Sequence, residues 1–172
     1  MLWSSMRLLI RATQAEDLPE ILAILNREIA EGAAHFGTEP ATLAEIKKEF
    51  ETSSDYPWTT AFDGGELAGF ARASAWKPRG GYLRTCEIGI YVRPEFQGRG
   101  IGGMIYRTFL PELQKRGFKT VLAGIALPNA ASIRLHERFG FTHVGTLPSV
   151  GWKLGEWRDV GYWALVYPDD GL

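Results

Sequence analysis

The segment Arg93-Pro-Glu-Phe-Gln97-Gly98-Arg99-Gly100-Ile101-Gly102-Gly103 decides the fold. It follows a run of alternating apolar residues, 86–92, which predicts a strand. It opens a second run, 98–116, whose apolar residues recur every fourth position and predict a helix. Glycines let main-chain amides approach a ligand closely, and a helix N-terminus carries partial positive charge. This turn is therefore predicted to bind a phosphate group.

Other interpretations of this turn remain. Gly98-x-Gly100-x-x-Gly103 matches the dinucleotide fingerprint, but it lies about a hundred residues into the chain, and the next predicted strand offers no acid for a ribose. A Walker-type loop is excluded, because no Gly-Lys-Ser/Thr follows. The remaining alternative is a glycine-rich turn that only ends a strand.

The apolar pattern on both sides of the turn predicts the other elements. Thr13 and Glu16 fit a capping box that opens a helix ending at Gly32, and Thr42 or Thr38 caps a second helix. A third helix opens at Pro128-Asn129 and ends near residue 140. Strands are expected at 8–10, 58–62, 67–75, 119–125, 141–144 and 163–167. Mixed strands and helices of this kind predict an α/β fold around one sheet.

Composition excludes several classes of protein. A chain of 172 residues and 19.1 kDa suits one domain. A formal charge of −1 argues against nucleic acid as a partner. One cysteine, Cys86, and three histidines argue against a metal centre, and Cys86 is expected to be a buried strand thiol. No apolar run approaches eighteen residues, and the start is too short for a secretory signal, so we expect no membrane association and a cytoplasmic location.

The glycine turn and a second segment resemble a known superfamily. Gln97-x-x-Gly100-x-Gly102 resembles the Q/R-x-x-G-x-G/A signature of the GNAT acetyltransferases, and residues 128–141 resemble their second signature. Phe36-Gly-Thr-Glu-Pro40, Trp76-Lys-Pro and Leu135-His-Glu137 resemble the phosphinothricin and methionine sulfoximine acetyltransferase branch. The resemblance implies an α/β (α+β) fold: one GNAT domain over residues 7–168, with a central mixed, largely antiparallel sheet and helices on both faces.

The resemblance also implies acetyl-CoA as co-substrate. The pyrophosphate is expected on the turn formed by Gln97, Gly98, Arg99, Gly100, Ile101, Gly102 and Gly103. Main-chain groups of Ile90, Tyr91 and Val92 are expected to pair with the pantetheine arm like an added strand. Asn129 is expected to bind that arm, although a helix N-cap alone also explains an asparagine there. In the family a bulge splays two parallel strands, and Gly89 is a plausible place for it.

Catalytic roles are expected for Glu87 and His136. Glu87 matches the family's catalytic glutamate, the predicted base, and its alternative is a solvated acid at a strand end. His136 lies seven residues after Asn129, so both project from nearly one helix face. It is expected to act as acid to the thiolate or as partner to Glu87, unless it is a core histidine.

Acceptor binding is expected at Phe36, Lys77, Arg79, Tyr82 and Arg84. The cations suit a carboxylate or phosphinate, although surface cations are usually only solvated. Gly37 stands where the phosphinothricin-resistance enzymes carry arginine, which argues against phosphinothricin as the best substrate.

Taken together, these residues predict an enzyme that acetylates the α-amine of a small amino acid-like acceptor, such as phosphinothricin, methionine sulfoximine or methionine sulfone. The alternatives are acetylation of a peptide or protein amine, and a non-catalytic acyl-CoA sensor. A homodimer is expected, with the aromatic C-terminal strands as its interface.

Overall fold

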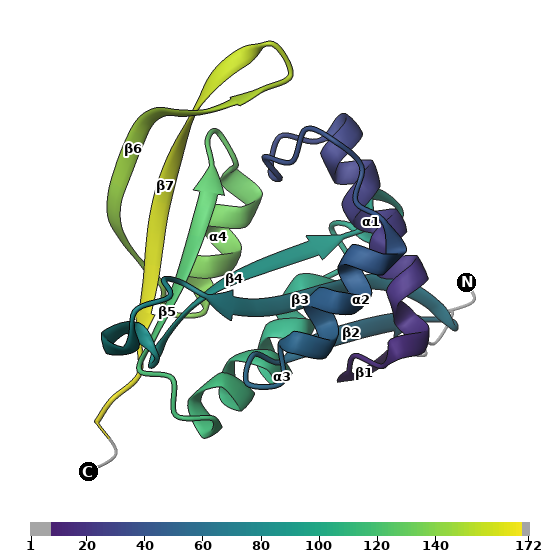
Figure 1. Ribbon diagram of the computed structural model, residues 1–172, viewed down its shortest axis with the longest axis horizontal. Coiled ribbons are helices and arrows are strands. Elements are labelled where there is room, and N and C mark those ends of the chain that lie inside the picture. The colour runs from purple at the N-terminus through teal and green to yellow at the C-terminus, as the bar shows by residue number, and fades with distance from the viewer. Residues whose placement is uncertain (1–7, 170–172) are drawn as a thin grey trace, which may run out of the picture.

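A computed structural model describes residues 8–169, so Arg7, the first residue of the predicted domain, lies outside the described residues. One sheet in the order β1-β2-β3-β4-β5-β7-β6 forms the centre, and only β4 and β5 pair in parallel (Figure 1). The strands are β1 Leu8–Ala12, β2 Trp58–Asp63, β3 Glu66–Ala75, β4 Thr85–Val92, β5 Thr120–Ala126, β6 Thr142–Lys153 and β7 Glu156–Val166. The α-helices are α1 Leu18–Glu31, α2 Leu43–Thr52, α3 Ile101–Lys115 and α4 Ala130–Arg138.

Two hydrophobic cores lie on opposite faces of the sheet. Along β3, Ala71 and Ala73 join a core built around α3, whereas Phe70 joins a core built around α1 and α2. The alternation continues in β4, where Ile88 packs toward α3 and Tyr91 toward α1. Neighbouring strand residues point to opposite faces, so each strand can serve both cores. The predicted fold class, a mixed and largely antiparallel sheet with helices on both faces, is confirmed.

The parallel strands β4 and β5 separate after a short paired stretch. Their register ends at Glu87, which faces Leu122, and the two strands then diverge (Figure 1). The bulge predicted at Gly89 is wrong, because Gly89 stays in unbroken register with Arg72 of β3. The separation therefore leaves β4 from Ile88 to Val92 without a strand partner on the β5 side.

The C-terminal hairpin is much longer than the sequence pattern predicted. Strands expected at 141–144 and 163–167 are the ends of β6 and β7, which pair through two register shifts. Glycine, proline and serine interrupt the alternation in β6, and most of its residues are exposed, so the periodicity signal is weak there. The hairpin carries large exposed apolar residues, namely Leu147, Val150, Trp152, Leu154 and Trp157.

The two predicted helix caps had different outcomes. Thr42, one of the two expected candidates, is the N-cap of α2, and it forms a capping box with Glu45 that was not predicted. The box predicted at Thr13 is wrong, because it forms one residue later between Gln14 and Asp17, ahead of α1. Asp17 is fixed there by two hydrogen bonds from the Arg11 guanidinium, of 2.7 and 2.8 Å. A tertiary ion pair therefore decides between two neighbouring cap positions. Within residues 8–169, no helix has the length and apolar character needed to span a membrane.

Candidate active site

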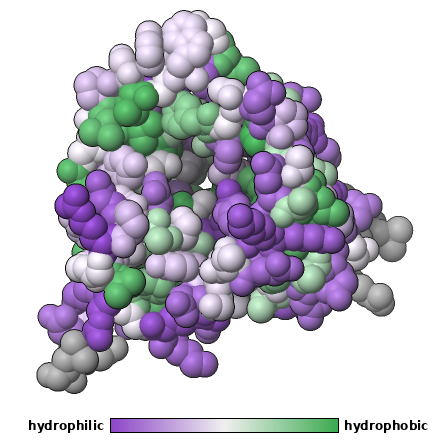
Figure 2. Space-filling model, viewed as in Figure 1, coloured by the Kyte–Doolittle hydropathy of each residue, from purple (hydrophilic) through white to green (hydrophobic). Residues whose placement is uncertain are grey.

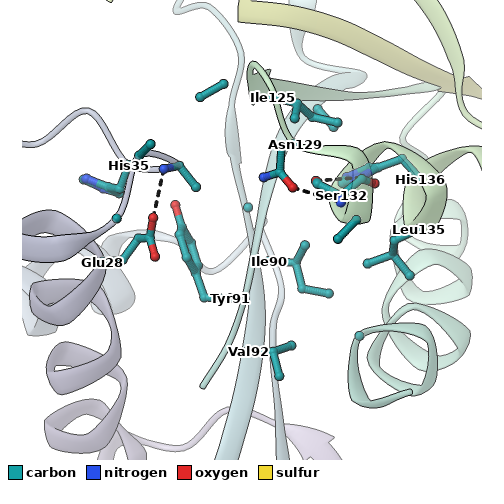
Figure 3. Close-up of a pocket in the computed structure, with 18 of the residues that line it drawn as sticks. Glu28, His35, Ile90, Tyr91, Val92, Ile125, Asn129, Ser132, Leu135 and His136 are labelled. Carbon is teal, nitrogen blue, oxygen red and sulfur yellow. Dashed lines mark hydrogen bonds between the residues drawn. The ribbon is translucent and has the colours of Figure 1, made fainter. Parts of the chain in front are cut away.

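A cleft of about 1800 Å³ opens where β4 and β5 diverge. Figure 2 shows the molecule hollowed between the β6–β7 hairpin and the α1 side. In Figure 3, Ile90 and Val92 of β4 lie at the middle of the cleft, Glu28 and His35 lie on one side, and Asn129 and α4 lie on the other. The cleft therefore has an α1 wall and an α4 wall, joined by the unpaired edge of β4.

The glycine turn lines one end of this cleft. Gly98 and Gly100 have φ values of 74° and 80°, in the left-handed region that favours glycine. The first main-chain bond of α3 runs from the Met104 amide to the Gly100 carbonyl, so the amides of 101–103 have no partner within the helix. These amides therefore remain available to an anion, which is what the binding site predicted from the sequence requires.

Two polar side chains of the turn bond to neighbouring strands. Gln97 Nε2 donates to the Val92 carbonyl at 3.1 Å, which ties the turn to the end of β4. The Arg99 guanidinium pairs with Asp63 at 2.7 Å and does not line the cleft. The side chain of Arg99 therefore points to β2, and only its main chain takes part in the turn.

The α4 wall begins at Asn129. Its Oδ1 accepts a hydrogen bond from the Ser132 amide at 3.1 Å, so it is a helix N-cap. The side-chain nitrogen is directed away from Ser132, toward the cleft (Figure 3). One side chain can thus cap α4 and still offer a donor to a ligand.

His136 lies in the same helix with both ring nitrogens engaged. Nε2 is 2.8 Å from the Tyr106 hydroxyl, and Nδ1 is 2.8 Å from the Ser132 carbonyl. The carbonyl can only accept, so Nδ1 carries the proton and Nε2 accepts from Tyr106. The residue is 3% exposed, and burial lowers its pKa, against the effect of the Ser132 hydrogen bond. Both ring nitrogens are therefore already hydrogen-bonded to groups of this chain.

Glu87 lies where the two parallel strands part. It is half-buried, and within the described residues its carboxylate makes no hydrogen bond or ion pair. Burial raises the pKa of the Glu87 carboxyl above its ordinary value. Gly124 of β5 gives it room, because a Cβ there would lie 3.1 Å from Glu87 Oε1. An acid of this kind, poised in a cleft without a partner, suits proton abstraction.

The residues predicted to bind the acceptor are divided by the fold. Phe36 lines the α1 wall of the cleft. Lys77, Arg79, Tyr82 and Arg84 lie on the exposed turn before β4 and do not line the cleft of this chain. The sequence could not show which of these residues reach the cleft, because the direction of a turn is not encoded in the residue types on it.

Several cleft residues were missed by the sequence analysis. Glu28, His35, Arg72 and Tyr162 come from α1, the loop after it, β3 and β7. Tyr162 faces Gly124 across the strand pair, and its ring approaches the same point as Glu87. Burial and then the Glu87 charge raise the pKa of the Tyr162 phenol. The sequence near these residues offers one hint of the site, the glycine at position 124. Its role becomes visible only when β5 is paired with β7.

Cys86 is a fully buried free thiol, and burial raises its pKa to about 12, which suits the expected inert strand residue. No group of three or more His, Cys, Asp or Glu side chains suited to a metal ion occurs in residues 8–169.

Residues 20–141 match the family described as "Acetyltransferase (GNAT) family". The chain is 41% identical over 155 residues to a phosphinothricin N-acetyltransferase of Streptomyces viridochromogenes, covering 90% of this chain and 85% of the relative. It is 36% identical over 159 residues to an L-methionine sulfoximine/L-methionine sulfone acetyltransferase of Pseudomonas aeruginosa, covering 91% and 92%.

A solved structure is similar along almost the whole chain. The phosphinothricin acetyltransferase of Sinorhizobium meliloti, in complex with acetyl-CoA, superposes with a TM-score of 0.88 at 30% identity. The match covers 95% of this chain and 97% of that one.

Proposed function

The chain belongs to the GNAT acetyltransferase family, and from that premise we propose that it transfers acetyl from acetyl-CoA to the α-amine of a small amino acid-like acceptor. The relatives named for phosphinothricin and for methionine sulfoximine or sulfone support this acceptor class. The observation that carries the proposal is the unpaired, half-buried Glu87 carboxylate in the same cleft as the free amides of the glycine turn.

The residues present fit acetyl-CoA. The amides of residues 98–103 suit its pyrophosphate, and the free edge of β4 at Ile90–Val92 suits an extended arm with amide groups. The Asn129 side-chain nitrogen is a further donor on the opposite wall. Bound acetyl-CoA would supply an acyl thioester. The residues of this chain would orient the thioester and accept a proton from the acceptor amine.

Glu87 is the proposed base. Its raised pKa brings the carboxylate closer to neutral pH, where a base is most effective. It takes a proton from the acceptor amine, either directly or through one water, while the amine nitrogen attacks the acetyl carbon. The new C–N bond replaces the thioester C–S bond, and the proton held by Glu87 or by the water passes to the leaving sulfur. For His136 we propose a positioning role, because its ring nitrogens are used by Tyr106 and Ser132 and hold α4 in place.

Thiol release over an acceptor panel tests the proposal. The panel contains phosphinothricin, methionine sulfoximine, methionine sulfone, common amino acids and a peptide with a free N-terminus. We expect Glu87→Gln to lower turnover by about 10²–10⁴ with little change in acetyl-CoA affinity. Glu66→Gln is the matched control, because Glu66 is exposed at the start of β3 and outside the cleft. Unchanged kinetics in Glu87→Gln would remove this residue from the base role.

A peptide acceptor is the second candidate function. The 77–84 turn does not line the cleft of this chain, so that turn does not close the acceptor side. Faster thiol release with the peptide than with every free amino acid would select this alternative. Acetyl-CoA binding without thiol release from any acceptor would instead indicate an acyl-CoA sensor.

We also propose a homodimer formed through the β6–β7 hairpin and a cytoplasmic location. Trp152 and Trp157 are 54% and 61% exposed and stack edge to face, with ring centroids 5.2 Å apart. Contiguous apolar patches of this kind are uncommon on monomers and mark interfaces. Sedimentation should give twice the chain mass, and Trp157→Lys should reduce it to that of one chain. The cytoplasm keeps thiols such as Cys86 reduced.

A further inference from the structure

Lys153, the last residue of β6, is buried without a carboxylate partner. It is 4% exposed, and among the described residues no acidic oxygen lies within ion-pair distance of its ammonium. Lysine is almost never buried to this degree unless it is paired. Such a position therefore needs an explanation from its surroundings.

The ammonium is held by two main-chain carbonyls from distant parts of the chain. It donates to the Gly37 carbonyl at 2.6 Å and also to the Ile29 carbonyl. Ile29 lies in the last turn of α1, where carbonyls lack helical partners and the helix carries partial negative charge. The Lys153 ammonium thus provides a hydrogen-bond donor for the Ile29 carbonyl at the end of α1. The same ammonium holds the loop after α1 through the Gly37 carbonyl.

The loop held in this way forms part of the α1 wall of the cleft. His35 and Phe36 line the cleft, and His35 Nδ1 accepts a hydrogen bond from the Gly37 amide at 2.9 Å. The Phe36 ring packs directly on β6, since a Cβ on Gly151 would lie 2.3 Å from its Cε1. Lys153, which does not line the cleft, and Gly151, which does, therefore fasten the same loop to the hairpin.

We propose that Lys153 is a positioning residue for acceptor binding, which sets His35 and Phe36 in place by fixing the Gly37 carbonyl to the end of β6. This rests on the proposed function, because it takes the α1 wall as the acceptor side. The glycine turn and Asn129 belong to other elements of the cleft and make no contact with Lys153 through the bonds described above. Acetyl-CoA binding should therefore not depend on it.

Lys153→Met tests the proposal, because it keeps the length of the side chain and removes the ammonium. We expect KM for the acceptor to rise about tenfold, while kcat at saturating acceptor and acetyl-CoA affinity change by no more than about twofold. The matched control is Lys119→Met. Lys119 also bonds a main-chain carbonyl, that of Tyr167, but lies outside the cleft, so its acceptor KM should stay at the wild-type value.

Deuterium uptake gives a readout that needs no activity. In Lys153→Met, uptake by residues 33–40 should rise, whereas in Lys119→Met it should not. If Lys153→Met does not fold, Gly151→Ala moves the Phe36 ring without removing the charge and should raise acceptor KM in the same way.

Wild-type acceptor KM and wild-type uptake in a folded Lys153→Met protein would overturn the proposal. Equal changes in both lysine variants would also overturn it, because they would show a general loss of stability. A wild-type protein that acetylates no acceptor would instead overturn the proposed function, and uptake by residues 33–40 would still test the contact.

Discussion

Replacing Gly124 by alanine tests whether the position of the Glu87 carboxylate controls the rate. Gly124 lies in β5 opposite Tyr162, and a Cβ there would stand 3.1 Å from Glu87 Oε1 and 3.4 Å from Tyr162 Cζ. The first contact is tighter than almost all real Cβ contacts, so the carboxylate must move by a few tenths of an ångström. A misplacement of about 1 Å can cost about a hundredfold in rate, so we expect kcat to fall by about tenfold.

Stability should change little in Gly124→Ala. The carboxylate is the far end of a flexible side chain, and alanine in a strand gains about 0.5–1 kcal/mol over glycine. Gly145→Ala is the matched control, since Gly145 lies in β6 and a Cβ there meets nothing within 4 Å. Thiol release and thermal unfolding are measured for both variants. Wild-type kcat in a folded Gly124→Ala protein would refute the argument that the placement of Glu87 matters.

Three further predictions concern pH and stability. The value of kcat/KM for the acceptor should fall as the pH drops through a value above 4.5, the ordinary pKa of glutamate. Burial raises the pKa of Glu87, and the base must be ionised to accept a proton. A pH profile of kcat/KM without this decrease on the acid side would contradict the prediction. Tyr106→Phe should cost about 1–3 kcal/mol of unfolding free energy in urea, because it leaves His136 Nε2 unpaired, with kcat almost unchanged; a large loss of kcat would return His136 to the chemistry. Asp17→Ala should lower the free energy of unfolding by about 2 kcal/mol. The loss is smaller than for a fully buried ion pair, because Arg11 is 28% exposed. An unchanged free energy of unfolding would show that this ion pair does not stabilise the protein.

Much of the fold was predictable because its signals are local. The glycine turn, the helix that follows it and the Thr42 cap depend on residues within a few positions of each other, although α3 begins at Ile101 and not at the predicted residue 98. The β6–β7 hairpin was predicted only at its ends, since its exposed, glycine-containing middle follows no strong period. The cap before α1 moved by one residue because Arg11, from the preceding strand, holds Asp17.

The sequence indicated the glycine turn and the strand edge that line the cleft, but much less of its α1 wall. The cofactor side is a continuous turn and strand edge, so its residues are neighbours in the sequence. The α1 wall, which we propose as the acceptor side, joins Glu28, His35 and Arg72 from three separate elements. Lys153 bonds to the loop of this wall from more than a hundred residues away. Such contacts exist only after the chain has folded, and no spacing in the sequence records them.

The parting of β4 and β5 has a consequence beyond catalysis. The register of β4 with β5 has three residue pairs, and the Arg84 carbonyl accepts from the Lys119 and Thr120 amides beside them, so beyond Glu87 the cleft separates the two halves of the sheet. On the proposed function, acetyl-CoA fills this cleft. A hundredfold excess of acetyl-CoA over its dissociation constant would then add about 2.7 kcal/mol to the free energy of unfolding. On the same proposal, each catalytic cycle fills and empties this cleft, and the stability of the protein would rise with the concentration of the acetyl donor.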